Sequence, residues 1–112
     1  MKQALSIRFF IGETTRKGTA VGAGTDAGKE ATALLCSAFP CHTLTHGIGV
    51  WNGTHEHSKT IEAIVEDSLC TREHARDVAR TLARILDQEC IGLAFRTLDA
   101  FELVGNPEEE DA

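Results

Sequence analysis

The stretch Cys41–Asp67, CHTLTHGIGVWNGTHEHSKTIEAIVED, decides the fold. Two runs in which apolar and polar residues alternate lie on either side of Asn52-Gly53. Asn-Gly is the strongest short-range signal for a hairpin, because both central residues of a type I′ turn need a positive φ. We therefore predict one long β-hairpin in which Trp51 faces Thr54.

Side chains alternate between the two faces of a strand, so this register divides the hairpin into two faces. The first face is apolar with three histidines, and it carries Leu44, Ile48, Val50, Ile61, Ala63, Val65, His46, His55 and His57. The second face is mostly polar and carries Trp51, beside which Gly47 and Gly49 leave gaps where a ligand can approach. We expect the first face to join the core and the second to form a pocket around the indole, unless the Trp simply faces solvent.

The remaining elements follow from periodicity and capping residues. In order, we predict a strand over Ala4–Ile11, a glycine-rich loop or ragged hairpin over residues 12–24, a helix from Thr25 or Asp26 to about Ala38, the hairpin, a helix opening at Ser68 or Thr71, and a strand over Cys90–Arg96. This order is the ferredoxin-like βαββαβ pattern of an α+β protein, with two helices on one face of a four-stranded antiparallel sheet. The open face needs cover, which favours a homo-oligomer.

Length and charge set further limits. The 112 residues suit one domain over residues 1–104, followed by an acidic, disordered tail over residues 105–112. The absence of a signal peptide and of a membrane-spanning run favours a cytoplasmic protein. Four cysteines without a CxxC pair favour buried, reduced thiols. A net charge of −6 argues against general nucleic-acid binding, since counterion release from a phosphate backbone requires basic residues.

Three patterns point to binding chemistry, and each has a plainer interpretation. The segment 23–30, AGTDAGKE, misses the P-loop consensus, because Glu30 replaces the magnesium-binding hydroxyl; an anion held at the helix start with Lys29 stays open. The trio His46, His55 and His57 is either a partial metal site or a set of partly exposed side chains. A ridge of arginines is either a solvated charged face or a surface for phosphate or an acidic partner; its members are Arg72, Arg76, Arg80 and Arg84.

Catalytic signatures are missing from the sequence. It has no tyrosine, no GxSxG and no HExxH, and no spacing forces a pair of carboxylates together. We therefore expect a protein that is not an enzyme and that needs no metal or other cofactor.

Two short stretches resemble small bacteriophage accessory proteins. They are the glycine-aromatic-glycine hairpin Gly47–Gly53 and the helix end Leu86-Asp87-Gln88-Glu89 before the last strand. The resemblance implies a phage protein that counters a host defence, by sequestering a nucleotide signal or by gripping a defence protein. The order of elements is also similar to that of the trimeric PII and CutA ligand binders, at the level of fold alone.

From these patterns we expect a protein that sequesters a small anionic, nucleotide-like ligand. The residues expected to bind it are Arg16, Lys17, Lys29, Thr45, Trp51 and Asn52. The basic side chains would hold phosphate, Trp51 would stack on a base, and Thr45 and Asn52 would supply hydrogen bonds. The alternative is an inhibitor that binds a host protein directly through its acidic surface.

Overall fold

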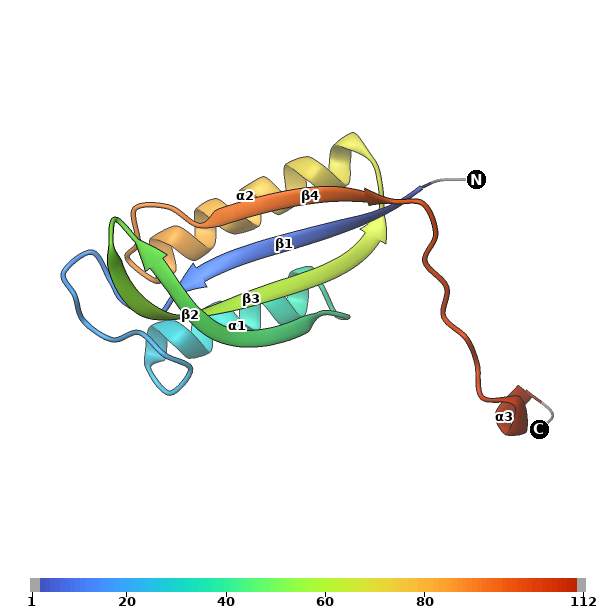
Figure 1. Cartoon of the computed structure of the whole chain (residues 1–112), viewed down its shortest axis with the longest axis horizontal. Helices are drawn as coiled ribbons and strands as arrows, with labels where there is room; N and C mark the ends of the chain where they lie inside the picture. Colours follow the sequence, from blue (N-terminus) through green and yellow to red (C-terminus); the bar gives the residue numbers. More distant parts are fainter. Residues whose placement is uncertain (1–2, 111–112) are drawn as a thin grey trace.

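The computed structural model describes residues 3–110, and the side chains of residues 3–108. Its elements are β1 (Ala4–Gly12), α1 (Asp26–Ala38), β2 (Thr43–Trp51), β3 (Thr54–Glu66), α2 (Leu69–Ile85), β4 (Gly92–Leu98) and α3 (Pro107–Glu110). The strands form one antiparallel sheet in the order β2-β3-β1-β4, and α1 and α2 lie together on one face of it (Figure 1). This arrangement confirms the predicted ferredoxin-like fold.

The hairpin has the predicted turn and register. Asn52 and Gly53 both have a positive φ, of 49° and 79°. Trp51 pairs with Thr54, and the pairing continues without a slip to Thr43 and Glu62. The Asn-Gly dipeptide therefore fixes which side chains of the hairpin share a face.

The core lies between the sheet and the two helices. Its center is β1, which places Leu5, Ile7, Phe9 and Ile11 on the helix side with no exposed surface. The helices bring a matching apolar stripe, consisting of Ala31 and Leu35 from α1 and Ala75, Val78, Ala79 and Leu82 from α2. Burial of such side chains is worth about 1.5–3 kcal/mol each, so β1 is the main anchor of the fold.

The outer half of the hairpin departs from the expected core face. Ile61 and Ala63 are buried as predicted, but Leu44, Ile48 and Val50 are 44%, 70% and 60% exposed. These three belong to β2, the edge strand of the sheet, whose apolar side chains the helices leave exposed. The assignment of side chains to the two faces was therefore right. The apolar side chains of β2 are exposed because this strand lies at the edge of the sheet.

The helix starts explain the sequence that misses the P-loop consensus. Thr25 caps α1, accepting a hydrogen bond from the backbone N–H of Gly28 at 3.0 Å. A Cβ at Gly28 would collide with the carbonyl oxygen of Gly22. Gly28 therefore serves close packing of the loop over the helix start. In the same way Ser68 caps α2 through the N–H of Thr71.

Two further features concern the cysteines and the C-terminal segment. All four cysteines are free, as predicted, but all are exposed, which corrects the expectation that they are buried. Residues 99–106 form no helix or strand, and they lead away from the sheet to the one-turn helix α3 (Figure 1). No helix among residues 3–110 is long and apolar enough to cross a membrane.

Candidate functional site

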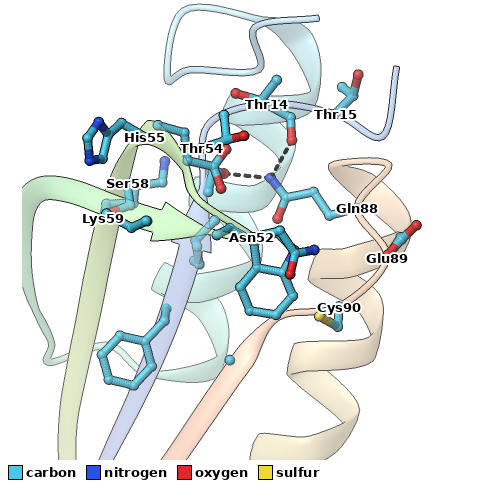
Figure 2. A pocket seen from close by; sticks show the side chains of 18 of the residues that line it. Thr14, Thr15, Asn52, Thr54, His55, Ser58, Lys59, Gln88, Glu89 and Cys90 are labelled. Atoms are coloured by element: carbon cyan, nitrogen blue, oxygen red, sulfur yellow. Dashed lines mark hydrogen bonds between the residues drawn. The ribbon is translucent and has the colours of Figure 1, made fainter. Parts of the chain in front are cut away.

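A cavity of about 800 Å³ lies at the hairpin tip. Its walls come from β2 and β3, from the start of the loop after β1, and from the segment between α2 and β4 (Figure 2). The residues that line it include Phe10, Arg16, Trp51, Asn52, Glu56, Gln88, Glu89 and Cys90. The volume lies in the range typical of small-molecule sites, about 300–1,000 Å³.

Two aromatic rings give the cavity its apolar part. Phe10 and Trp51 are both exposed, and both belong to the sheet face that no helix covers. The ring of Phe10 lies against Gly92, its partner on β4, because a Cβ at Gly92 would sit 3.0 Å from the Cβ of Phe10. The absent side chain at Gly92 lets the phenyl ring remain against the strand and present a surface to the cavity.

The charged residues that line the cavity are the carboxylates Glu56 and Glu89 and the basic side chains Arg16 and Lys59. Glu56 lies on the open face of β3, half-buried, with its carboxylate over Gly12; a Cβ at Gly12 would be 2.7 Å from Oε1 of Glu56. Within the described residues, Glu56 makes no ion pair and no hydrogen bond through its side chain. Glu89 lines the opposite wall and is exposed. A carboxylate that has no ion pair or hydrogen bond and lies beside aromatic rings favours a ligand with positive charge.

One wall of the cavity is tied to another by a polar strap. Gln88 donates its Nε2 hydrogens to the carbonyl oxygens of Gly12 at 2.5 Å and Thr14 at 3.2 Å (Figure 2). Arg16 donates its Nε–H to Oδ1 of Asp87 at 2.8 Å and its backbone N–H to the carbonyl oxygen of Asp87. These four bonds fix the loop after β1 against the end of α2, and so they set the width of the cavity.

The six residues expected to bind a ligand do not gather in one place. Arg16, Trp51 and Asn52 line the cavity, although Arg16 is engaged by Asp87. The other three lie outside it. Lys17 is in the exposed loop after β1, Lys29 is on the exposed first turn of α1, and Thr45 is on β2.

The sequence reasoning missed Phe10, Glu56, Gln88 and Glu89 as cavity residues. One of them was within reach, because the hairpin register already put Glu56 on the face of Trp51. Phe10 required knowing that β4 pairs with β1 and brings Gly92 beneath its ring. Gln88 required the contact between two loops that lie 76 residues apart.

Of the three histidines on the helix side of the hairpin, His55 lines the cavity, whereas the arginine ridge lies outside it. His46 approaches Glu13 at 3.9 Å, and the described residues contain no group of three or more metal-binding side chains. Three of the four arginines in the ridge form ion pairs with carboxylates: Arg72 with Asp67, Arg76 with Glu73, and Arg80 with Asp77. The hydrogen bond from Arg72 lowers the pKa of Asp67. The ridge is thus a charge-laced, solvated face.

The comparisons with known proteins add an enzyme to this picture. A structure described as a phage SAM lyase in complex with S-methyl-5′-thioadenosine superposes with a TM-score of 0.68, at 16% identity, over 94% of this chain and 92% of the other. The phage SAM lyase in its apo state gives 0.60, at 17% identity, over 85% and 81%. No family model matches the sequence, and no curated protein does. At this identity the likeness shows a shared fold.

This finding confirms one expectation in coarse form and contradicts others. The likeness to phage proteins holds at the level of fold, since both structures are phage proteins. The expectation that a protein of this kind is not an enzyme was wrong, because its structural neighbours are an enzyme. The same finding overturns both non-enzymatic readings, the sequestering protein and the direct inhibitor of a host protein.

Proposed function

We propose that this protein is an enzyme that cleaves S-adenosylmethionine (SAM) in the cavity at the hairpin tip and releases S-methyl-5′-thioadenosine. The observation that carries the proposal is the unanswered carboxylate of Glu56 beside the exposed rings of Phe10 and Trp51. The whole-chain likeness to a phage SAM lyase supports it.

The chemistry of SAM matches this lining. The molecule joins a flat adenine to a sulfonium ion and an α-ammonium group. An aromatic ring offers a stacking surface for adenine and also attracts a cation within about 6 Å of its centroid. Glu56 and Glu89 supply negative charge at the walls. A protein with a net charge of −6 also draws a cationic substrate from solution.

The reaction needs little from the protein beyond placement. A sulfonium carries its own leaving group: when the bond from sulfur to the γ-carbon of the methionine part breaks, the electron pair stays on sulfur as a neutral thioether. The γ-carbon then forms a new bond in one of two ways. Either the substrate's own carboxylate attacks it and forms a lactone, or the β-carbon loses a proton to Glu56 and a double bond forms between the β- and γ-carbons. Holding the substrate in a reactive conformation is worth about 7–11 kcal/mol in favourable cases, so positioning supplies a large part of the catalysis and the charge of Glu56 adds to it.

The test is to incubate purified protein with SAM and to follow both products by liquid chromatography with mass detection. We expect S-methyl-5′-thioadenosine from the wild type and at least about 100-fold less from Glu56→Gln, since an electrostatic contact to the reacting center is worth a factor of this order. Glu30→Gln, an exposed carboxylate of α1 outside the cavity, is the matched control. A folded wild type that leaves SAM intact, or a Glu56→Gln variant with wild-type rates, would contradict the proposal. The second product separates lactone formation from elimination.

We place this activity in the cytoplasm of a bacterial host, in a phage-encoded protein that assembles as a homo-oligomer. Removal of SAM would deprive a host defence of its methyl donor or of a signal made from it. Expression in bacteria should then lower the cellular ratio of SAM to S-methyl-5′-thioadenosine, whereas expression of Glu56→Gln should leave that ratio unchanged. Equal ratios in the two strains would contradict this role.

A further inference from the structure

Two segments expose apolar side chains that contact little of the chain itself. One is the outer strand β2, with Leu44, Ile48 and Val50 exposed on its helix side. The other is the segment 99–106, in which Leu103 and Val104 are 90% and 87% exposed. Large apolar side chains left in water at two places of one small chain indicate a surface that is covered in the assembled state.

Strand β2 has an unprotected edge. It lies at one end of the sheet order, so among the described residues only β3 pairs with it. The nine residues of β2, TLTHGIGVW, include no lysine, no carboxylate and no proline. Natural proteins usually protect an edge strand with such residues, because its free N–H and C=O groups invite another strand. The edge of β2 is therefore built to accept one.

The segment 99–106, DAFELVGN, has the properties of the missing strand. Phe101 and Leu103 lie on either side of Glu102, so in an extended strand both would face the same side. Phe101 lies beside Ile64 and Val65, and the segment then runs away from the body of the protein (Figure 1). Eight extended residues span roughly 26 Å at about 3.3 Å per residue, which nearly matches the length of the nine-residue β2.

Charge also fits this pairing. The C-terminal segment contributes acidic side chains, Glu102 and Glu108 among them. The helix side of the hairpin tip carries His46, His55, His57 and Lys59, while the glutamates of β3 lie on the opposite face; the carboxylate near these side chains is that of Glu13, at 3.9 Å from His46. An acidic strand laid on β2 therefore meets mainly histidine side chains on that side.

We propose that residues 99–106 of one copy of this chain add as a strand to the edge of β2 in a second copy. The partner is a second copy because the segment leaves from β4, at the opposite edge of the sheet from β2 (Figure 1). Such a contact joins different surfaces on the two subunits, so it closes either as a reciprocal pair or as a ring. The apolar side chains of the two segments then cover one another.

The test uses the full chain and two single substitutions, Leu103→Glu on the donated segment and Ile48→Glu on the receiving strand. Leu69→Glu is the matched control, because Leu69 is equally exposed but lies at the start of α2, outside both segments. Circular dichroism checks that each variant is folded. Native mass spectrometry measures assembly, and hydrogen exchange measures protection of the β2 amides that do not bond to β3.

We expect an oligomer with protected outer β2 amides for the wild type and for Leu69→Glu. Both Leu103→Glu and Ile48→Glu should lose the oligomer and that protection, without SAM present, so the result does not depend on catalysis. A monomeric wild type would overturn the proposal. So would an oligomer whose outer β2 amides exchange freely, or one that survives both substitutions.

Discussion

The strap between the two cavity walls gives the sharpest prediction for substrate binding. Gln88→Ala removes the donor to the carbonyl oxygens of Gly12 and Thr14. Each such hydrogen bond contributes about 1 kcal/mol net, so the loop after β1 loses roughly 2 kcal/mol of support. A difference of 1.4 kcal/mol is about a factor of ten in an equilibrium constant. If these two hydrogen bonds alone hold the loop in place, the fraction of molecules with a correctly placed loop falls by up to about 30-fold.

The kinetic signature follows from what the strap does. It shapes the binding wall and leaves the carboxylate of Glu56 in place, so KM for SAM should rise by up to about 30-fold while kcat changes much less. Gln88→Glu should behave in the same way, because a carboxylate of similar size cannot donate to the two carbonyl oxygens. Steady-state rates of S-methyl-5′-thioadenosine formation measure both constants, and calorimetric titration with that product measures binding alone.

The chain offers a matched control in its other glutamine, Gln3, which immediately precedes β1 and lies outside the cavity. Gln3→Ala should leave KM unchanged. A Gln88→Ala enzyme with wild-type KM would refute the reasoning. A fall in kcat with no change in KM would refute it as well, because it would mean that Gln88 acts on the reacting atoms.

Three more predictions concern stability and can be measured by denaturant or thermal unfolding. Phe9→Ala, which empties a fully buried site at the center of the core, should cost about 3–5 kcal/mol. Hydrogen bonds from Ser6 and Arg8 hold the pKa of Glu62 below its usual 4.5. Their contribution to the free energy of unfolding is therefore complete above about pH 4.5 and is lost as the pH falls through the lowered pKa. Glu62→Gln should flatten this loss of stability in the acidic range, and an unchanged slope would contradict the prediction. Arg80→Ala should change the free energy of unfolding by less than about 0.5 kcal/mol, since its ion pair is exposed; a larger loss would mean that the arginine ridge is structural.

Local signals in the sequence were enough for the fold. The Asn52-Gly53 turn needs only the two residues that form it, and the caps Thr25 and Ser68 act within one helical turn. Once the hairpin and both helices are placed, the order of elements leaves few topologies, because connections are short and sequential elements usually pack together. The burial of β2 was not predictable in this way, since an edge strand and a central strand can share one alternating pattern.

The cavity was harder to predict because it is assembled from distant segments. Trp51 and Asn52 were found because they flank a recognisable turn. Glu56 is an ordinary glutamate of an alternating strand until the structure places it over Gly12. Arg16 was wrongly expected to hold an anion, because its partner could not be seen in the sequence. Asp87, which lies 71 residues away along the chain, binds its guanidinium.

The expectation that the protein is not an enzyme failed for a chemical reason. Catalytic signatures in sequences mostly record a nucleophile, a base or a metal, which must be held at fixed spacing. The proposed substrate brings a charged leaving group and, in its carboxylate, its own nucleophile, so the protein must mainly bind and fold it. In the proposed site, the rings, the carboxylate of Glu56 and the width of the cavity would perform that task. An enzyme of this kind has no sequence motif of reactive residues. Its activity is instead indicated by a cavity on the open face of the sheet, which only the structure reveals.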